Sequence, residues 1–267
     1  MLRQLRRIVV LVLASGLACA LLVSYAPGTA VDERELDRRL NEASIREIRS
    51  NKASAADILS NLRRYIVGLA KGDLGYSESN HASIAALIAD RAPETLREIA
   101  IGLTGGWLLG LALAIPKRGF SILAGLLLSL PIALIAYLCL AAGAKSFLVL
   151  VIVLTPRIYR FARNLITQAN NALHVEMARA RGVTETRILF SHVLPSISPQ
   201  LLALAAASAS MAIGAAIPIE AICDVPGLGK LAWNAAMARD LPLLVNLTML
   251  VAIATTVATA VSEIRHD

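Results

Sequence analysis

Charged residues are scarce in this sequence, and that scarcity excludes an ordinary soluble domain. Asp, Glu, Lys and Arg make up 17% of the 267 residues, whereas a typical soluble domain contains about 25%. Hydrophobic residues account for 57%, and the mean hydropathy is +0.65. They form continuous runs rather than the periodic patterns of amphipathic elements. The sequence therefore predicts a polytopic membrane protein.

Cysteines are also few, and no catalytic motif is present. Cys19, Cys139 and Cys223 lie far apart and match no metal-binding or redox spacing. The first two lie inside apolar runs, which indicates small buried side chains. The segment Pro226–Lys230 superficially resembles a phosphate-binding loop, but it lacks the first glycine and the Ser or Thr after the lysine. We therefore expect no enzyme activity, no metal site and no nucleotide bound by this chain.

Six apolar runs dominate what is present. A bilayer core of about 30 Å requires about 20 helical residues, and several runs are slightly shorter than that. Asn246 and several threonines interrupt the last run, and we expect them to face other helices, where such side chains form hydrogen bonds. The fold class is therefore predicted to be all-α, with six transmembrane helices. The runs are Ile8–Tyr25, Ile99–Ile115, Phe120–Ala142, Phe147–Ile166, Leu201–Ile219 and Leu243–Val261.

Basic residues cluster at the ends of these runs and indicate how the chain is oriented. The formal net charge is +7. The basic residues lie in alternate loops, however, and do not form a single surface that would bind nucleic acid. The connections Ala144–Ser146 and Ala221–Pro242 carry little net charge. The positive-inside rule then places both termini and the loop after the fourth run in the cytoplasm. The basic residues are Arg3, Arg6 and Arg7, then Lys117 and Arg118, then Arg157, Arg160, Arg163, Arg179, Arg181 and Arg187.

The first run has a second interpretation as a cleaved signal peptide, because a basic segment precedes the apolar stretch Ile8–Val23. A cut after Ala26 would place Pro27 beside the cleavage site, which is unfavourable, and the run is long for a signal peptide. We therefore expect residues 1–26 to be retained as the first transmembrane helix. Residues 27–97 are mostly hydrophilic with apolar residues at helical spacing, so we expect a helical extracytoplasmic excursion.

The most specific pattern lies in the basic stretch between the fourth and fifth runs. Glu176 is followed six positions later by Gly182, and twelve and thirteen positions beyond that by Leu194 and Pro195. This spacing resembles the EAA loop of ABC-importer permeases, in which a short cytoplasmic helix docks on the ATPase subunit. By that resemblance, the residues that couple to the ATPase are Glu176, Ala178, Arg179, Ala180, Gly182, Leu194 and Pro195.

Local chemistry agrees with a helix–turn–helix loop at this place. Glu176 lies where a helix would begin, and a negative charge is favourable there. Gly182 supplies a permissive residue just past the helix end, and Thr184 can cap a second helix. The small side chains of Ala178 and Ala180 would allow close approach to the ATPase.

The second helix of the loop is predicted to be amphipathic. Ile188, Leu189 and Val193 form its apolar stripe, and Pro195 is expected to end the helix and redirect the chain toward the membrane. The alternative is a basic amphipathic loop that lies on anionic lipid. The spacing from Glu176 to Pro195 favours the coupling loop.

Other motifs resemble permeases of the dipeptide, oligopeptide and nickel importer family over nearly the whole chain. They are Ala26–Gly28, Gly72-Asp73-Leu74-Gly75-Tyr76-Ser77, Arg91–Leu96, Ser129–Pro131, Glu220 with Pro226-Gly227-Leu228-Gly229, and Ala238–Pro242. The resemblance implies an extracytoplasmic loop region that contains Gly72, Asp73, Gly75, Glu220, Pro226, Gly227 and Gly229.

The chain departs from the family pattern in three places. It is shorter than usual, mainly because the connection Gly143–Ser146, which helps to form the wall of the substrate vestibule, is almost absent. Met177 replaces the first alanine of the EAA triplet, and His192 stands where an aliphatic residue is usual. Glu220 lies at the end of its run, so we interpret it as an interfacial acid rather than an intramembrane one.

The resemblance implies a permease subunit that forms half of the pathway for peptides or a similar small solute. Its partners would be a second, related permease, two cytoplasmic ATPases that carry the ATP and magnesium, an extracytoplasmic solute-binding protein and membrane lipid, with no nucleic acid. It would be a multi-pass protein of the bacterial inner membrane. Residues 98–262 would form a five-helix permease core with the coupling loop 170–197, and residues 263–267 a cytoplasmic tail.

Two other classes of function remain open. One is a membrane subunit that keeps the permease fold as a scaffold without transporting. The other is an independent channel or secondary transporter. No ATPase motif occurs in the chain, so energy would come from another subunit. The spans are interpreted as having essentially no ionisable residues between their ends, and this disfavours a self-sufficient, ion-coupled transporter.

Overall fold

The computed structural model describes residues 14–16, 18, 74–77, 79–115 and 120–263. Most of the predicted first span 1–26, the segment 27–73 with Gly72 and Asp73, and residues 264–267 lie outside the described residues. The described elements are β1 (Tyr76–Ser77), β2 (Ala82–Ser83), α4 (Ile84–Ala114), α5 (Ser121–Ser129), α6 (Ile132–Ala141), α7 (Ser146–Asn170), α8 (Leu173–Ala180), α9 (Glu185–Ile188), the π-helix η2 (Leu189–Val193), α10 (Leu194–Ile222), α11 (Leu228–Met237) and α12 (Leu241–Glu263).

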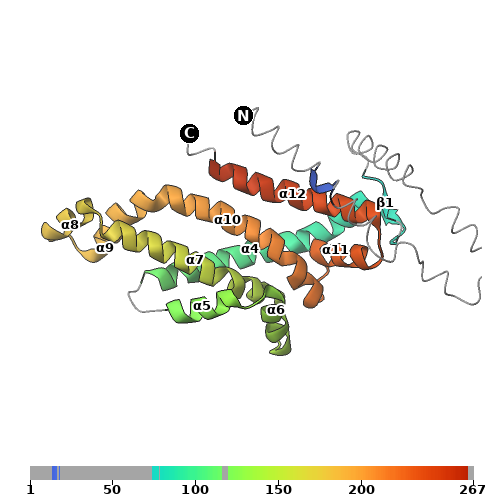
Figure 1. The fold of residues 1–267 in the computed structure, drawn as a ribbon, viewed down its shortest axis with the longest axis horizontal. Helices are drawn as coiled ribbons and strands as arrows, with labels where there is room; N and C mark the ends of the chain where they lie inside the picture. Colours follow the sequence, from blue (N-terminus) through green and yellow to red (C-terminus); the bar gives the residue numbers. More distant parts are fainter. Residues whose placement is uncertain (1–13, 17, 19–73, 78, 116–119, 264–267) are drawn as a thin grey trace, which may run out of the picture.

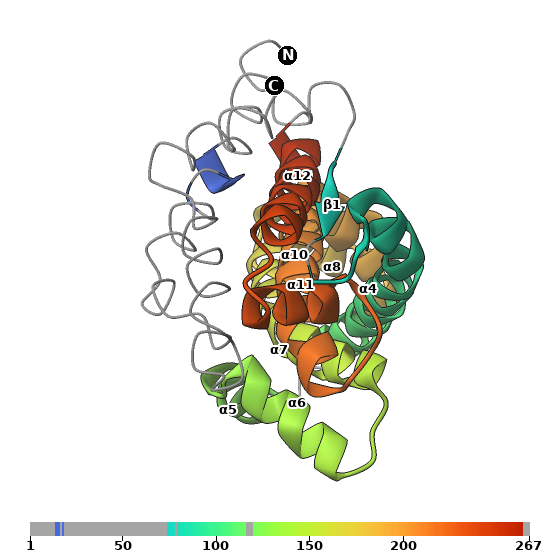
Figure 2. The same ribbon diagram turned by 90° about the vertical axis from the view of Figure 1, so that its right-hand side faces the viewer.

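Four long helices, α4, α7, α10 and α12, run along the length of the molecule (Figure 1). The short helices α8 and α9 lie at one end of these helices, and α11 and β1 lie at the other. Strands β1 and β2 form a two-stranded antiparallel hairpin, with Tyr76 opposite Ser83 and Ser77 opposite Ala82. Figure 2, which looks along the long helices, shows α12 and α4 on either side of β1. The candidate site residues therefore separate into two groups, one at each end.

Within the described residues, three helical stretches are long and apolar enough to cross a membrane: Ile84–Ala114, Glu185–Ile222 and Leu241–Ala260. A fourth is added if the bent pair α5 and α6 is counted as one span. Helix α7 is not among them, although it corresponds to the predicted run Phe147–Ile166. It carries Arg157, Arg160 and Arg163, so the expectation that spans lack ionisable residues between their ends is wrong for this helix. Six transmembrane helices are therefore not established by the described part of the chain.

The predicted third run, Phe120–Ala142, is broken rather than straight. Helices α5 and α6 meet at an angle of 102°. Leu130 and Pro131 are both extended at the break, with ψ angles of 138° and 141°. A residue before proline is driven out of the helical region, and proline cannot donate the hydrogen bond that would continue the helix. The Ser-Leu-Pro motif is therefore the physical cause of the bend.

The contact between α4 and α7 depends on small residues. Gly102, Gly106 and Gly110 are buried on one side of α4, spaced four residues apart as on a single helix face. A Cβ atom on Gly110 would lie 2.8 Å from Ile158 Cγ2, and one on Gly106 would lie 3.0 Å from Leu154 Cβ. Small residues let helix backbones approach closely in a membrane, and here they receive the large side chains of α7.

Helix α4 also begins earlier than its apolar run. Ser83 occupies the N-cap position, and its hydroxyl accepts a hydrogen bond from the Ala86 N–H at 3.4 Å. The predicted boundary at residue 97 therefore falls inside a continuous helix, and the division of the chain into segments stays a prediction. At the other end of α4, Arg163 Nη1 donates to the Ala114 carbonyl at 3.0 Å, where a cation stabilises the negative end of a helix.

Two sequence expectations about helix interiors need correction. Pro195 does not end a helix, because Glu185–Ile222 runs as one 38-residue helical stretch. The π-helix precedes it, and the Leu194 N–H donates to the Leu189 carbonyl, five residues back. Among the described residues, Asn246 forms no hydrogen bond with another long helix. Its side-chain amide donates to the carbonyls of Leu74 and Pro242, both at 2.9 Å.

Candidate functional site

Gly182 closes the turn between α8 and α9. Its φ angle is +79°, a left-handed conformation that glycine adopts without strain. The Gly182 N–H donates to the Arg179 carbonyl at 3.0 Å, and the Val183 N–H donates to the Ala178 carbonyl at 3.2 Å. This pair of bonds is a Schellman motif, which ends a helix at a glycine. The expected position of Gly182 just past the helix end is therefore confirmed.

The two short helices are also joined by a bidentate ion pair. Arg179 Nε lies 2.6 Å from Glu185 Oε1, and Arg179 Nη2 lies 3.1 Å from Glu185 Oε2. The bond to this carboxylate raises the pKa of the Arg179 guanidinium. Thr184 stands at the N-cap position of α9 in an extended conformation, but its side chain makes no capping hydrogen bond. The expected capping by Thr184 is therefore wrong.

One side of the α8–α9 unit packs inside the chain. Val175, Ile188 and Val193 are fully buried, and Ala178 is 7% exposed. They belong to one cluster with the second half of α7. The interpretation that Ala178 packs against an ATPase is therefore wrong, because Ala178 faces its own chain. The stripe of Ile188, Leu189 and Val193 is confirmed as the inward side of the second helix.

The other side of α8 is a continuous exposed face. Leu173, Glu176, Met177 and Ala180 are all exposed and follow the spacing i, i+3, i+4, i+7 of a single helix face. We call these four residues the α8 outer face. Leu173 and Met177 are 68% and 54% exposed. Sequence reasoning missed both, although their helical spacing from Glu176 and Ala180 would have found them.

Phe190, in the adjacent π-helix, is another large exposed hydrophobic residue at this end, with 61% of its surface accessible. Leu194 is half-buried and packs on the inward cluster, whereas Pro195 is exposed. Of the seven predicted coupling residues, Glu176 and Ala180 thus lie on the outer face. Arg179, Gly182 and Leu194 hold the unit together, and Ala178 is inside it.

A buried carboxylate organises the opposite end of the molecule. Glu220, near the end of α10, is fully buried within the chain, and its interpretation as an interfacial acid stays a prediction. The Gly229 N–H donates to Glu220 Oε2 at 2.6 Å. The Leu228 N–H donates to Thr95 Oγ1 of α4 at 2.8 Å. The loop after α10 therefore folds back onto α10 and fastens it to α4.

Two glycines of this loop are required by lack of space. A Cβ atom on Gly227 would collide with the Glu220 carboxylate, and one on Gly229 would lie 2.5 Å from the Ile217 Cα. Glu220, Gly227 and Gly229 are thus brought together, as the motif predicts, while Pro226 stands exposed in the same turn. Gly75 lies apart from them, before β1, with a φ of +79°.

Asp240 forms a second buried carboxylate site that the predicted residue set does not contain. It is 1% exposed. Its Oδ2 accepts hydrogen bonds from the hydroxyls of Ser77 and Ser79 at 2.6 and 2.7 Å, and its Oδ1 accepts one from the Leu243 N–H at 3.1 Å. Burial alone would raise the pKa of Asp240, but these hydrogen bonds outweigh it and lower the pKa. An aspartate just before an apolar helix signals an N-cap.

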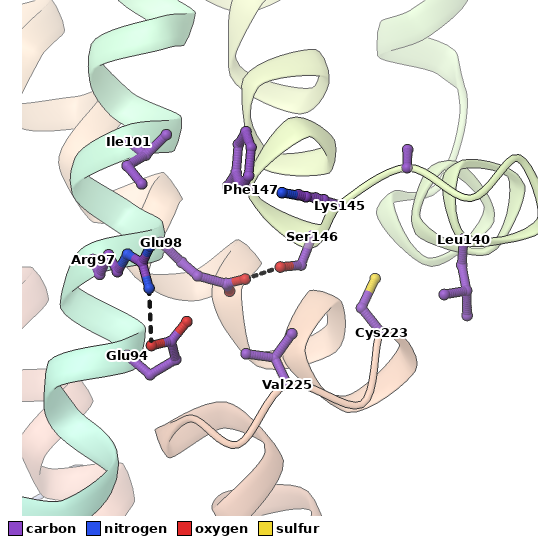
Figure 3. Close-up of a pocket in the computed structure, with 11 residues that line it drawn as sticks. Glu94, Arg97, Glu98, Ile101, Leu140, Lys145, Ser146, Phe147, Cys223 and Val225 are labelled. Atoms are coloured by element: carbon purple, nitrogen blue, oxygen red, sulfur yellow. Dashed lines mark hydrogen bonds and ion pairs between the residues drawn. The ribbon is translucent and has the colours of Figure 1, made fainter.

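A recess of about 330 Å³ lies between α4, the start of α7 and the loop after α10 (Figure 3). The Ser146 hydroxyl donates to the Glu98 carboxylate, and Arg97 Nη1 lies 3.8 Å from Glu94 Oε2. The short connection Ala144–Ser146 forms part of its wall. No group of three or more His, Cys, Asp or Glu residues within the described ranges could hold a metal ion.

The α8 end and the Glu220 end both lie within a segment of the chain that matches a known protein family. Residues 102–267 match the family model described as binding-protein-dependent transport system inner membrane component. A putative peptide permease of Brucella ovis is 29% identical over 219 residues, which covers 68% of this chain and 69% of that protein. The oligopeptide transport system permease OppB of Haemophilus influenzae is 26% identical over 235 residues, 76% of each chain.

A solved structure has the same fold. It is that of the MetNI methionine ABC transporter in inward-facing conformations, and it aligns with a TM-score of 0.52 at 20% identity. The alignment covers 66% of this chain and 97% of that chain.

Proposed function

Because the chain belongs to the family of binding-protein-dependent transport system inner membrane components, we propose that it forms half of the translocation pathway of an ATP-driven importer of peptides or similar small solutes. The family consists of multi-pass permeases of the inner membrane and not of enzymes. ABC-importer permeases for peptides are among the relatives of this chain. Several apolar helices of spanning length agree with that role.

The observation that carries the proposal is the α8 outer face with Phe190 beside it. Exposed Leu173, Met177 and Phe190 lie at the end of the long helices. Fully burying a side chain of this size contributes about 1.5–3 kcal/mol, so this face is suited to a protein partner. Glu176 adds a charge that can fix the orientation of the docked surface. We propose that an ATPase subunit covers it.

The α8–α9 unit can transmit a displacement by such a partner to the long helices. The Schellman turn at Gly182 and the Arg179–Glu185 ion pair hold the two short helices together. Buried Val175 and Ile188 fasten the unit to α7. The stretch Glu185–Ile222 then continues as one helix to the Glu220 end. A displacement of α8 would therefore tilt α7 and α10 together, which changes access to the pathway.

The remaining partners follow from the family. A second, related permease would complete the pathway, and two cytoplasmic ATPases would supply ATP and magnesium. A solute-binding protein would deliver the solute at the end that contains α11. The basic residues near α8 support a cytoplasmic position for that end, with both termini on the same side.

The importer function has two alternatives, an ion-coupled transporter and a scaffold subunit. The absence of ionisable groups cannot be used against an ion-coupled transporter, since α7 contains three arginines; family membership decides against it instead. A scaffold subunit would bind the ATPases without supporting uptake. ATP-dependent uptake by vesicles that contain the assembled complex distinguishes the importer from the scaffold.

The docking face is tested by Met177→Asp in the assembled complex. We expect it to abolish copurification of the ATPase subunits and ATP-driven uptake, because a buried unpaired carboxylate opposes docking. Met237→Asp is the matched control: Met237 is 66% exposed in α11, at the opposite end. It should keep full ATPase binding. Full ATPase binding by Met177→Asp would overturn the assignment of this face.

A further inference from the structure

Arg157 lies near the middle of α7. Ile158 packs opposite Gly110 of α4, and Leu154 packs opposite Gly106. Arg157 is therefore level with the turn of α4 that contains Trp107, the centre of the predicted span Ile99–Ile115. Along α7, it lies six residues, or about 9 Å, from Arg163.

The guanidinium of Arg157 is directed at a second helix at the same depth. Its Nη1 lies 2.6 Å from the sulfur of Met211, near the centre of the predicted span Leu201–Ile219. Arg163, two turns closer to the α8 end, instead reaches the last carbonyl of α4. Arg157 is exposed beside Met211, whereas Arg163 lies at the end of α4.

A groove between α7 and α10 surrounds Arg157. It has a volume of about 510 Å³, within the range of about 300–1,000 Å³ for small-molecule sites. Leu154, Phe161, Leu204 and Met211 give it apolar walls, and Gln200 and Ser208 add polar groups. Ser208 is held in place by Trp107, whose Nε1 donates to its hydroxyl at 2.9 Å. The groove thus offers one cation, two neutral polar groups and an apolar surface.

Within the described residues, no carboxylate forms an ion pair with Arg157. Its contact with the Met211 thioether does not neutralise the charge. A charged side chain within a predicted membrane segment is costly and is kept where it faces a pathway or an opposite charge. The groove accordingly lacks an anion of its own, and a passing solute can supply one.

We propose that Arg157 binds a carboxylate of the transported solute as it crosses the permease. This inference rests on the proposed importer function and specifies its substrate as an anionic or zwitterionic small solute, such as a peptide with a free C-terminus. The planar guanidinium suits bidentate binding of a carboxylate, which a lysine ammonium does not reproduce. The apolar walls receive the side chains of the solute.

The test compares the uptake of Ala-Ala-Ala with a free and with an amidated C-terminus by vesicles that contain the whole complex. Arg157→Gln should lower uptake of the free acid about tenfold relative to the parent, and should leave uptake of the amide unchanged. Each peptide is compared only with itself, so any preference of the binding protein cancels. Arg160→Gln, one turn away and outside the groove, removes the same charge and should leave both rates near those of the parent.

A second pair of variants keeps Arg157 in place. Met211→Glu sets a carboxylate beside the guanidinium and should lower uptake of the free acid as Arg157→Gln does, whereas Met211→Gln, which has a similar size without the charge, should lower it less. Equal effects of Arg157→Gln on both peptides would overturn the inference. Loss of the second permease on purification of Arg157→Gln would also overturn it, because Arg157 would then pair with that subunit. If the parent complex showed no ATP-driven uptake, the proposed importer function itself would be contradicted.

Discussion

Gly182 is required for its backbone conformation and not because space around it is lacking. Its φ of +79° requires the left-handed region, yet nothing lies within 4 Å of the position where a Cβ would stand. The requirement is therefore conformational and not steric. Gly227 is the opposite case, because its Cβ would collide with the Glu220 carboxylate.

Gly182→Val should therefore loosen the turn between α8 and α9, because a β-branched residue resists a positive φ by about 1–3 kcal/mol. We expect fewer solutes to be transported per ATP hydrolysed, with normal membrane insertion. Gly182→Asn is the control, since asparagine tolerates this conformation and the site has room for it. Uptake and ATP hydrolysis are measured on the same vesicles. A Val variant as well coupled as the Asn variant would show that the turn has no role in coupling.

Single residues differ in how well sequence predicts them. Gly182 was predictable because the Schellman turn depends on its immediate neighbours alone. Ala178 was not, because the sequence of an amphipathic helix does not say which face meets its own chain and which meets a partner. Glu220 was missed as a buried group because its burial depends on a loop that returns from Pro226 to Gly229. Asp240 is buried by β1, which is more than 160 residues away in sequence.

At the scale of elements, the closest packing joins α4 to α7. The three glycines of α4 leave no space for larger residues opposite Leu150, Leu154 and Ile158. The periodic glycines are visible in the sequence, but their partner helix is not. The break between α5 and α6 was also missed, although Pro131 supplied a local signal for it.

Gly110→Val tests the α4–α7 contact. The new side chain would meet Ile158 Cγ2 at 2.8 Å and the Tyr159 backbone nitrogen at 3.3 Å, so the helices must separate. Overpacking of this kind costs about 1–3 kcal/mol, and the melting temperature of the purified permease should fall. Gly214→Val in α10 makes the same change at a position with nothing within 4 Å. Its melting temperature should fall less, and an equal fall would contradict close packing by Gly110.

At the scale of the whole molecule, the two groups of site residues lie at opposite ends of the long helices. The α8 outer face is at one end, and Glu220 and Asp240 are at the other. Charge provides the expected orientation, with the α8 end in the cytoplasm. The alternating basic loops predicted this separation from the sequence. The number of spans was predicted less well, because α7 lies among the long helices but carries three arginines.

The orientation is checked by single cysteines in an otherwise cysteine-free chain. A cysteine at Arg179 should be unreactive toward a membrane-impermeant maleimide in intact cells and should react after the cells are opened. A cysteine at exposed Met237 should react in intact cells. Labelling of the cysteine at position 179 from outside would invert the proposed topology.

The unbroken helix from Glu185 to Ile222 has a mechanical consequence. At 1.5 Å per residue, its 38 residues measure about 57 Å. A rod of that length turns small rotations into large translations: tilting it by about 5° about one end carries the other end through about 5 Å, close to the pitch of one helical turn. The α8–α9 unit is attached at one end of this lever, and the Glu220 clasp on α4 is attached at the other. Under the proposed orientation, a small tilt at the cytoplasmic α8 end would therefore be enough to open or close the pathway at the other end of the helix.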